Sequence, residues 1–264
     1  MTTLFAVSED GARIAYDMTG IGPALVLLHG AGQTRRAWHD AGYVTRLRDQ
    51  FRVITMDIRG HGESDKPIRV ESYAIDRLIH DVLSVVDAAQ VTEFSLWGYS
   101  YGGNIGRYLP AGANRMSRLV IMGISFGTAA PAPFRQYAVS LRAKWAPVIE
   151  ANESGTLDLG TLSEQDRALW HTGTIPLTIA QLSAILDWPP VEPADLSCPT
   201  LWVVGSANEQ AMPSAREHQS RLAGTHVTLE VLQGLTHADE LSKIDEVLPP
   251  MLKFTLGATE RPGT

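Results

Sequence analysis

One serine in the sequence is flanked by glycines at i−2 and i+2, within the stretch WGYSYGG from Trp97 to Gly103. The stretch follows the apolar run FSLW and opens a segment expected to be helical. A sharp turn from strand to helix strains its central residue, and side chains at i−2 and i+2 would collide with backbone. Gly98 and Gly102 remove that obstacle, so the pattern predicts that Ser100 is an exposed nucleophile. A simple helix cap would need no such glycines.

A serine hydroxyl is a poor nucleophile at neutral pH and needs a base within hydrogen-bond reach, a role that suits histidine. Among eight histidines, His237 lies in LQGLTHADE, a predicted loop between the last strand and the last helix. We therefore expect His237 to be the base. Other histidines fall on predicted helices or strands and are expected to face solvent or to pack: His39, His80, His171, His218 and His226.

The composition is that of an ordinary globular chain. It has 264 residues, 44% hydrophobic and 19% charged, enough for one large domain or a domain with an insertion. The net charge of −7 and the scattered basic residues argue against a nucleic-acid surface. Residues 1–17 show no signal peptide or membrane anchor, so a cytoplasmic location is expected. The single cysteine, Cys198, excludes an internal disulfide and a thiolate zinc cluster.

Short apolar runs alternate with longer amphipathic segments, which predicts an α/β fold with a mainly parallel sheet covered by helices. The first two runs alternate polar and apolar residues and predict an antiparallel edge, whereas later runs predict strands buried on both faces. Residues 73–90 predict a helix. The eight predicted strands are Thr3–Val7, Ala12–Asp17, Ala24–His29, Phe51–Asp57, Glu93–Gly98, Arg118–Gly123, Thr200–Gly205 and His226–Leu232.

The strand rhythm stops over residues 127–193, which are rich in proline, tryptophan and helical stretches. We expect this segment to be a lid inserted into a core made of residues 1–126 and 194–264. Its three tryptophans, Trp145, Trp170 and Trp188, are candidates for substrate binding, and the alternative is that they only pack the lid onto the body.

Three motifs in order, LLHGAG (27–32), DIRGHGESD (57–65) and WGYSYGG (97–103), resemble those of the α/β-hydrolase superfamily, and the resemblance covers almost the whole chain. It implies an eight-stranded, mostly parallel sheet with helices on both faces and a small helical lid. It also implies an oxyanion hole formed by the backbone N–H groups of Ala31 and Tyr101. Four residues of the first two motifs are expected to be scaffolding: His29, Asp57, Arg59 and His61.

The acid that orients the histidine normally follows the seventh strand of this superfamily, in a G-x-x-D pattern. Here the segment is VVGSANEQAMP (203–213), with Asn208 at the acid's position. Asn208 could orient the imidazole itself, without stabilising its positive charge. Alternatively, Glu209 could reach the histidine, or the site could be impaired. The segment after the sixth strand, IMGISFG (121–127), offers no carboxylate.

The resemblance implies a serine hydrolase that cleaves a carboxylic ester or lactone through an acyl-enzyme, without metal or organic cofactor. The apolar lid, with the three tryptophans together with Phe126 and Phe134, suggests that the small-molecule substrate is hydrophobic. We expect no nucleic-acid or membrane partner, and a monomer or homodimer. A serine elbow argues against epoxide hydrolase and haloalkane dehalogenase chemistry, which uses a carboxylate. Carbon–carbon bond hydrolases, haloperoxidases, amidases and a ligand-binding receptor or weakly active relative remain alternatives. Arg35 and Arg36 either contact a substrate carboxylate or lie in a solvated helical turn.

Overall fold

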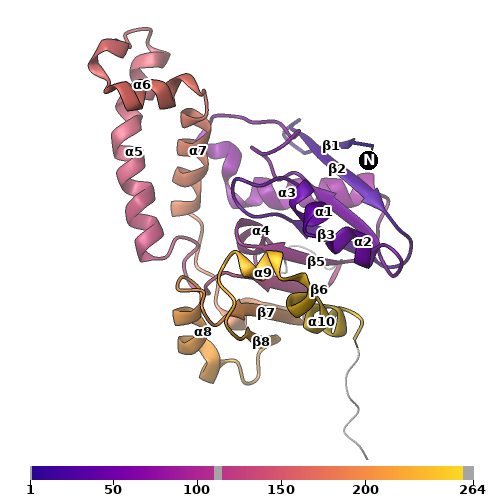
Figure 1. Cartoon of the computed structure of the whole chain (residues 1–264). Coiled ribbons are helices and arrows are strands. Elements are labelled where there is room, and N and C mark those ends of the chain that lie inside the picture. The colour runs from indigo at the N-terminus through magenta and orange to yellow at the C-terminus, as the bar shows by residue number, and fades with distance from the viewer. Residues whose placement is uncertain (1, 110–114, 258–264) are drawn as a thin grey trace, which may run out of the picture.

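The computed structural model of the chain describes residues 2–109 and 115–257, which form an eight-stranded sheet flanked by helices (Figure 1). The sheet order is β1-β2-β4-β3-β5-β6-β7-β8. All eight predicted strands are present, with ends shifted by two residues or fewer. They are β1 (Leu4–Val7), β2 (Arg13–Thr19), β3 (Ala24–Leu28), β4 (Arg52–Met56), β5 (Phe94–Tyr99), β6 (Met116–Met122), β7 (Thr200–Gly205) and β8 (Val227–Leu232).

The pairing confirms the predicted antiparallel edge. β1 pairs antiparallel with β2 and β2 antiparallel with β4, whereas the other neighbouring strands are parallel. Every residue of β3, β5 and β7 is buried, as expected for parallel strands covered on both faces. Parallel strands end at one common edge, so the segments that follow β3, β5, β6, β7 and β8 come together there.

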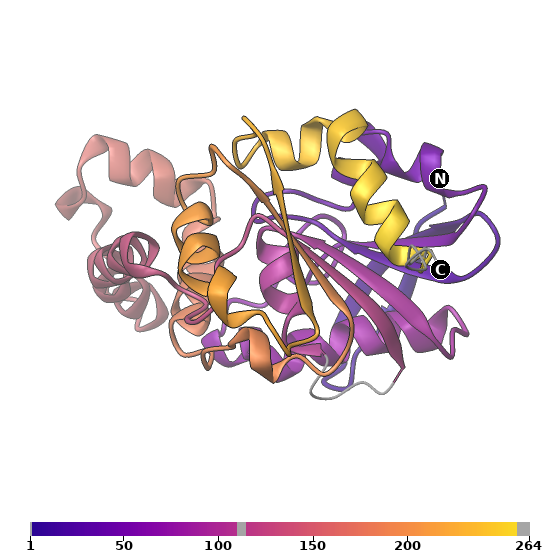
Figure 2. The same cartoon turned by 90° about the horizontal axis from the view of Figure 1, so that it is seen from below.

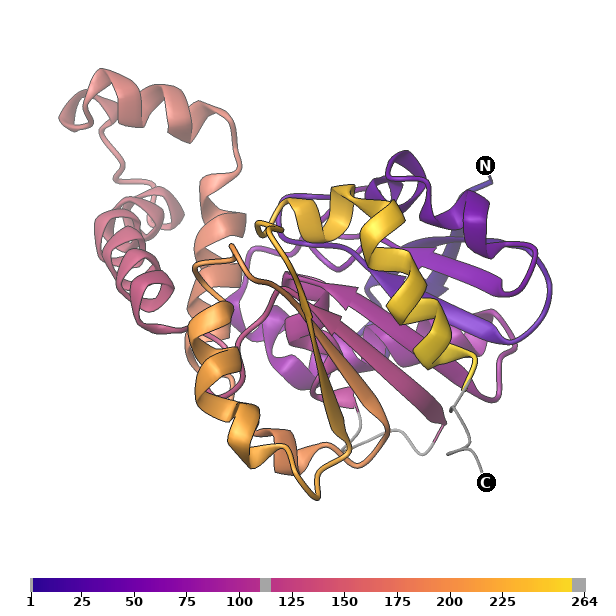
Figure 3. The same cartoon turned by 60° about the horizontal axis from the view of Figure 1, so that its bottom comes forward.

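Two apolar cores, one on each face of the sheet, arise from the alternation of side chains along the strands. In β3, Val26 and Leu28 join one core, and Leu25 and Leu27 join the other. The first core packs α3 (Ile75–Ala88), α4 (Tyr101–Gly106) and α8 (Met212–His218); the second packs α1 (Arg36–Asp40), α2 (Tyr43–Leu47), α9 (Asp239–Ser242) and α10 (Ile244–Thr255). Figure 2 and Figure 3 show the sheet between α10 and the α3–α4 layer.

Between β6 and β7 the chain forms a helical cap that stands away from the sheet (Figure 1). Its helices are α5 (Ala132–Glu153), α6 (Glu164–His171) and α7 (Ile175–Leu186). Gly127 and Val191, where the chain enters and leaves the cap, exchange two backbone hydrogen bonds of 2.8 and 3.0 Å. Within the described ranges, no helix combines the length and apolarity needed to cross a membrane. Short 3-10 helices lie at Val70–Tyr73, Leu159–Thr161, Pro193–Asp195 and Gln219–Arg221.

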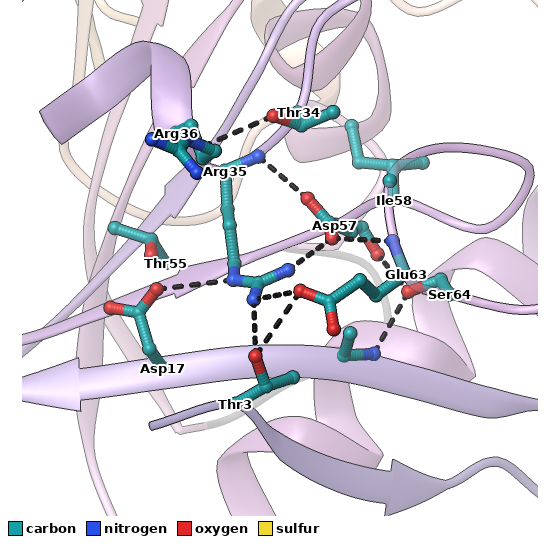
Figure 4. A network of polar contacts seen from close by, with 12 residues as sticks. Thr3, Asp17, Thr34, Arg35, Arg36, Thr55, Asp57, Ile58, Glu63 and Ser64 are labelled. Atoms are coloured by element: carbon teal, nitrogen blue, oxygen red, sulfur yellow. Dashed lines mark hydrogen bonds and ion pairs between the residues drawn. The ribbon is translucent and has the colours of Figure 1, made fainter. Parts of the chain in front are cut away.

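A buried ion-pair network ties the loops after β3 and β4 together (Figure 4). The Arg35 guanidinium contacts the carboxylates of Asp17, Asp57 and Glu63. Asp57 also accepts hydrogen bonds from the backbone N–H groups of Arg35 (2.7 Å) and Glu63 (2.9 Å). Arg35 is therefore structural, and neither alternative predicted for it, contact with a substrate carboxylate or a solvated helical turn, describes this buried side chain. Arg36 is exposed in the first turn of α1.

Candidate active site

The turn from β5 into α4 holds Ser100 in a strained conformation. Its φ of 52° and ψ of −114° lie where residues with a side chain are rarely found. A Cβ on Gly98 would lie 2.5 Å from the carbonyl oxygen of Gly102, and one on Gly102 would lie 2.3 Å from that of Leu28. Both glycines are thus required by close backbone approach, for the reason that the sequence indicated.

His237, in the loop after β8, contacts Ser100. Its Nε2 lies 3.0 Å from Ser100 Oγ, the distance of a hydrogen bond. The residue before the serine also holds the histidine, because the Tyr99 hydroxyl donates to the His237 carbonyl (2.8 Å) and the two rings stack at 5.0 Å. The structure therefore brings Ser100 and His237 together as predicted, with the candidate nucleophile and the candidate base in direct contact.

Glu240, in the first turn of α9, contacts the other ring nitrogen of His237. Its Oε2 lies 3.0 Å from Nδ1, and the residue is completely buried. The backbone N–H of Gly205 donates to Oε1 (2.7 Å), and Asn208 Nδ2 lies 2.9 and 3.0 Å from the two carboxylate oxygens. Glu240 was not among the site residues predicted from the sequence. Its position three residues after His237 was the only local signal, and because His237 lies in the loop before α9, that spacing by itself does not predict a contact.

Asn208 lies beside His237 as expected, but it presents its amide nitrogen. Its Oδ1 accepts hydrogen bonds from the backbone N–H groups of Gln210 (3.0 Å) and Ala211 (3.1 Å), so Nδ2 faces Glu240 and lies 3.1 Å from His237 Nδ1. The reversed amide would place Oδ1 against the carboxylate and Nδ2 against two donors. Asn208 therefore cannot accept a hydrogen bond from the Nδ1–H of His237, which corrects the expectation that it takes over the acid's role.

Glu209, the other candidate for the acid, has an exposed side chain. Among the described residues, Glu240 and Asn208 have side-chain atoms within hydrogen-bond distance of His237 Nδ1, and Glu209 has none. The order of the loop explains this difference, because Asn208 is drawn inward by the two backbone donors that follow it and Glu209 then points outward. The alternative of a loop shifted by one residue does not describe this structure.

The two expected oxyanion donors flank Ser100 at one pocket, which is lined by both Ala31 and Tyr101. In the oxyanion loop, the N–H of Gly30 donates to Gln33 Oε1 (2.9 Å) and that of Gly32 to His61 Nε2 (3.3 Å). The Ala31 N–H between them has no assigned acceptor among the described residues. The same holds for the Tyr101 N–H, which opens α4 and has no intrahelical partner. Both amides are thus available to a developing oxyanion.

The pocket at Ser100 has a volume of about 160 Å³ and lies between the body and the cap. No charged side chain lines it in the described part of the chain. Its polar lining comes from neutral groups such as Asn104, Ser125, Thr128 and Gln210, and its apolar wall is formed by Ile124, Ala129, Pro131, Phe134 and Ile185. A site of this kind accommodates a small, uncharged, apolar group.

None of the three candidate tryptophans lines this pocket. Trp145 is buried within the cap, where it packs with Ile175 and stacks on Trp170 at 6.1 Å. Trp188 lies between cap and body, stacked at 5.9 Å on the side chain of Tyr101, and its Nε1 donates to the Tyr73 carbonyl (3.1 Å). The tryptophans are thus packing residues, as the alternative interpretation held. The apolar side chains that the cap contributes to the pocket include Phe134 and Ile185.

Burial shifts the titration of several groups around the site. Desolvation raises the pKa of Tyr99 to about 12, and the nearby Glu240 carboxylate acts in the same direction. Desolvation lowers the pKa of His29 to about 4 and also lowers that of His61. His29 Nε2 accepts from the Ile58 N–H (3.0 Å), so this histidine is neutral scaffolding, as expected.

In the described ranges, no three His, Cys, Asp or Glu side chains gather to hold a metal ion.

Sequence comparisons identify relatives over part of the chain. The family profile described as alpha/beta hydrolase fold matches residues 23–148. An uncharacterised protein of Mycobacterium tuberculosis is 40% identical over 98 residues, which are 36% of this chain and 27% of that protein. Epoxide hydrolase 4 of Mus musculus is 33% identical over 38% of this chain and 28% of its own length. 3-Oxoadipate enol-lactonase 1 of Acinetobacter baylyi is 36% identical over 38% of this chain and 37% of its own length. The chain thus spans well under half of these relatives.

Solved structures match nearly the whole chain. A hydrolase from Pseudomonas aeruginosa aligns with a TM-score of 0.71 and 25% identity, covering 96% of this chain and 98% of that one. A thermophilic esterase from Thermogutta terrifontis aligns with a TM-score of 0.72 and 19% identity, covering 97% and 99%. Together with the elbow, the sheet order and the family profile, these matches show that the chain belongs to the α/β-hydrolase superfamily.

Proposed function

We propose that the protein is a serine hydrolase that cleaves a carboxylic ester or lactone through an acyl-enzyme. The observation that carries this proposal is the 3.0 Å contact between Ser100 Oγ and His237 Nε2, at a pocket that also holds two free backbone donors. A nucleophile, a base and an oxyanion site within one pocket are the parts that acyl transfer requires.

The reaction follows from these positions. Ser100 Oγ attacks the carbonyl carbon while its proton passes to His237 Nε2, and the N–H groups of Ala31 and Tyr101 bind the oxyanion. The tetrahedral intermediate expels the alcohol, which takes the proton from Nε2. Water then gives a proton to Nε2 and attacks the acyl carbon, and collapse of the second intermediate releases the acid and restores Ser100. Every proton moves between Ser100, His237, the substrate and water.

The pocket supports a small, uncharged acyl group. The departing oxygen must face His237 to receive its proton, and His237 is not among the pocket's lining residues, so the acyl side of the substrate occupies the pocket. A volume of about 160 Å³ holds a group of roughly benzene size. A carboxylate on the acyl chain would meet no cation there, which disfavours dicarboxylic substrates.

The nucleophile distinguishes this proposal from epoxide hydrolysis, although epoxide hydrolases are among the relatives. Ring opening by Ser100 would leave an ether between the enzyme and the alkyl group. An ether lacks the acyl carbon that water attacks, so the enzyme would be alkylated once and would not turn over. An ester or lactone carbonyl avoids this dead end.

The first test is the intact mass after treatment with a serine-directed fluorophosphonate. We expect one adduct on the wild type and none on Ser100→Ala, because only an activated serine displaces fluoride rapidly. His237→Ala should label far more slowly, since the base is lost. A wild type that stays unlabelled, or a Ser100→Ala variant that labels equally, would refute the proposal.

The second test is a series of p-nitrophenyl esters from acetate through butyrate to octanoate. We expect kcat/KM to be greatest for the short chains and to fall for octanoate. Phe134→Ala should raise relative activity on octanoate by about tenfold, because it removes part of the apolar wall. Tyr137→Ala, on the same helix but 58% exposed, is the matched control and should leave the preference unchanged. An unaltered preference in Phe134→Ala would mean that the acyl group binds elsewhere.

A further inference from the structure

We infer that Glu240 supplies the acid of this site, three residues after the base, and that Asn208 serves as its hydrogen-bonding clamp. The inference rests on the proposed function. It assigns the orientation of His237 to a carboxylate on α9, rather than to the loop after β7 where the motif places it. Glu240 and Asn208 are positioning residues, because neither touches Ser100 or the pocket.

Three segments converge on His237 Nδ1, and only one of them brings a carboxylate. At the end of β6 stands Gly123, whose added Cβ would lie 2.2 Å from Glu240 Oε2 and 2.7 Å from His237 Nδ1. At the end of β7 stands Asn208, whose donor side faces inward. The Glu240 side chain enters the remaining space from α9. Among the described residues, Glu240 is thus the one buried carboxylate against the imidazole, and Gly123 leaves the space that it occupies.

The contacts of Glu240 match the needs of an ionised acid. A buried carboxylate is tolerated when hydrogen-bond donors surround it. The Gly205 N–H donates to Oε1, Asn208 Nδ2 donates to the carboxylate, and His237 Nδ1–H donates to Oε2. This arrangement keeps the proton on Nδ1, so Nε2 is free to accept the proton of Ser100. When Nε2 gains that proton, the imidazolium lies 3.0 Å from a carboxylate.

The same geometry explains why residue 208 is an amide here. Its Nδ2 lies 2.9 and 3.0 Å from the two oxygens of Glu240. A carboxylate at that position would place two acids in contact, and both could not be ionised together. The relocated acid and the amide therefore form a matched pair, and the asparagine does not mark an impaired site.

The direct experiment is Glu240→Gln, with Glu246→Gln as control, because Glu246 lies exposed on the next helix. The amide keeps the side chain's size and can still accept from the Gly205 N–H, so the fold should persist. It cannot act as an ionised acceptor for Nδ1–H, and we expect kcat to fall by roughly 10⁴-fold. The control should keep wild-type kcat.

Two further readouts separate orientation from mere packing. The acidic limb of the kcat/KM profile should move to lower pH in Glu240→Gln, because the imidazolium loses its negative partner. Tyr99, the other titratable side chain stacked on His237, stays neutral in this range since its pKa is raised to about 12. A far-downfield proton resonance from the Nδ1–H to carboxylate bond should be present in the wild type and absent from the variant.

The most discriminating experiment exchanges the carboxylate and the amide between positions 240 and 208. Asn208→Asp alone restores the motif's acid, yet we expect it to lower kcat, because it sets two carboxylates in contact. The double variant Asn208→Asp/Glu240→Gln again pairs one carboxylate with one amide beside Nδ1. It should recover kcat at least about tenfold over Glu240→Gln, since the carboxylate has only changed sides.

The outcomes distinguish this inference from the proposed function. If the fluorophosphonate fails to label the wild type, the proposed function is wrong. If the wild type labels but Glu240→Gln keeps near-normal kcat and pH dependence, the inference about Glu240 is overturned. A rise in kcat for Asn208→Asp, or a loss in Glu209→Gln as large as in Glu240→Gln, would also overturn it.

Discussion

At the scale of residues, the candidate site depends on glycines, because a side chain in their place would occupy the space of the candidate catalytic residues. Gly123 has a φ of 68°, and its missing side chain is the space that the His237–Glu240 pair occupies. The segment around it, residues 121–127, contains no carboxylate. The structure shows that the empty position matters, because any side chain there would displace the pair.

Gly123→Ala should therefore lower kcat by about 10²-fold or more, through displacement of the imidazole from Ser100. The positive φ alone costs about 1–2 kcal/mol for a residue with a Cβ, so a control must share that strain. Gly127→Ala is suitable, because Gly127 has a φ of 82° but its added Cβ would come no closer than 3.6 Å to a neighbour. Similar kcat losses in both variants would show that strain, and not the clash, is responsible.

At the scale of elements, the cap has its own small core. Trp145 on α5 is buried against Ile175 and Ile179 of α7, and Trp170 of α6 packs against the same cluster. Phe134 and Ile185, from the same two long helices, line the pocket. The tryptophans hold α5 and α7 together, and those helices in turn carry the apolar wall. Their effect on substrates is therefore indirect.

Trp145→Ala should cost about 3–5 kcal/mol in cap stability, because it empties a buried aromatic site. We expect faster amide hydrogen exchange across α5–α7 with unchanged protection of β3, β5 and β6. The conservative Trp145→Phe keeps most of the packing and should leave KM for butyrate esters unchanged. A raised KM in Trp145→Phe, with normal exchange in the cap, would instead indicate direct substrate contact.

At the scale of the whole molecule, buried histidines make stability depend on pH. The pKa of His29 is lowered from 6.5 to about 4 by burial, so the folded chain keeps this ring neutral while the unfolded chain protonates it below pH 6.5. The unfolded state then binds more protons, and the free energy of unfolding falls as the pH drops from 6.5 towards 4. This difference corresponds to roughly 3 kcal/mol when complete.

Urea unfolding between pH 7 and pH 4.5 would measure this dependence. His29→Gln, whose amide can accept from the Ile58 N–H but does not titrate, should show a smaller loss of stability over that interval. Its stability at pH 7 is expected to be lower, so the comparison concerns the slope with pH. Equal slopes in the two proteins would show that His29 does not carry the effect.

Much of the fold could be predicted because it is encoded in short stretches. Apolar runs of strand length predict the eight strands, because a central strand must bury the side chains on both of its faces and an edge strand must bury those on one face. The candidate nucleophile could also be predicted from a short stretch, because the strain at Ser100 and the close backbone approach at Gly98 and Gly102 arise within one turn. His237 was found from the chemistry that a serine requires and from its loop after the last strand.

Other features were decided only by the tertiary structure. Many surface helices carry a glutamate three residues from a histidine, so the spacing of His237 and Glu240 alone has no special meaning. The spacing becomes significant only in the folded chain, where pairing of β7 with β8 brings the Gly205 N–H and the Asn208 side chain into contact with the Glu240 carboxylate. Likewise, the orientation of the Asn208 amide depends on which donors and acceptors surround it. The chain's own order thus determines the candidate nucleophile and the candidate base, whereas the proposed acid is selected by burial and by hydrogen bonds between segments far apart in sequence.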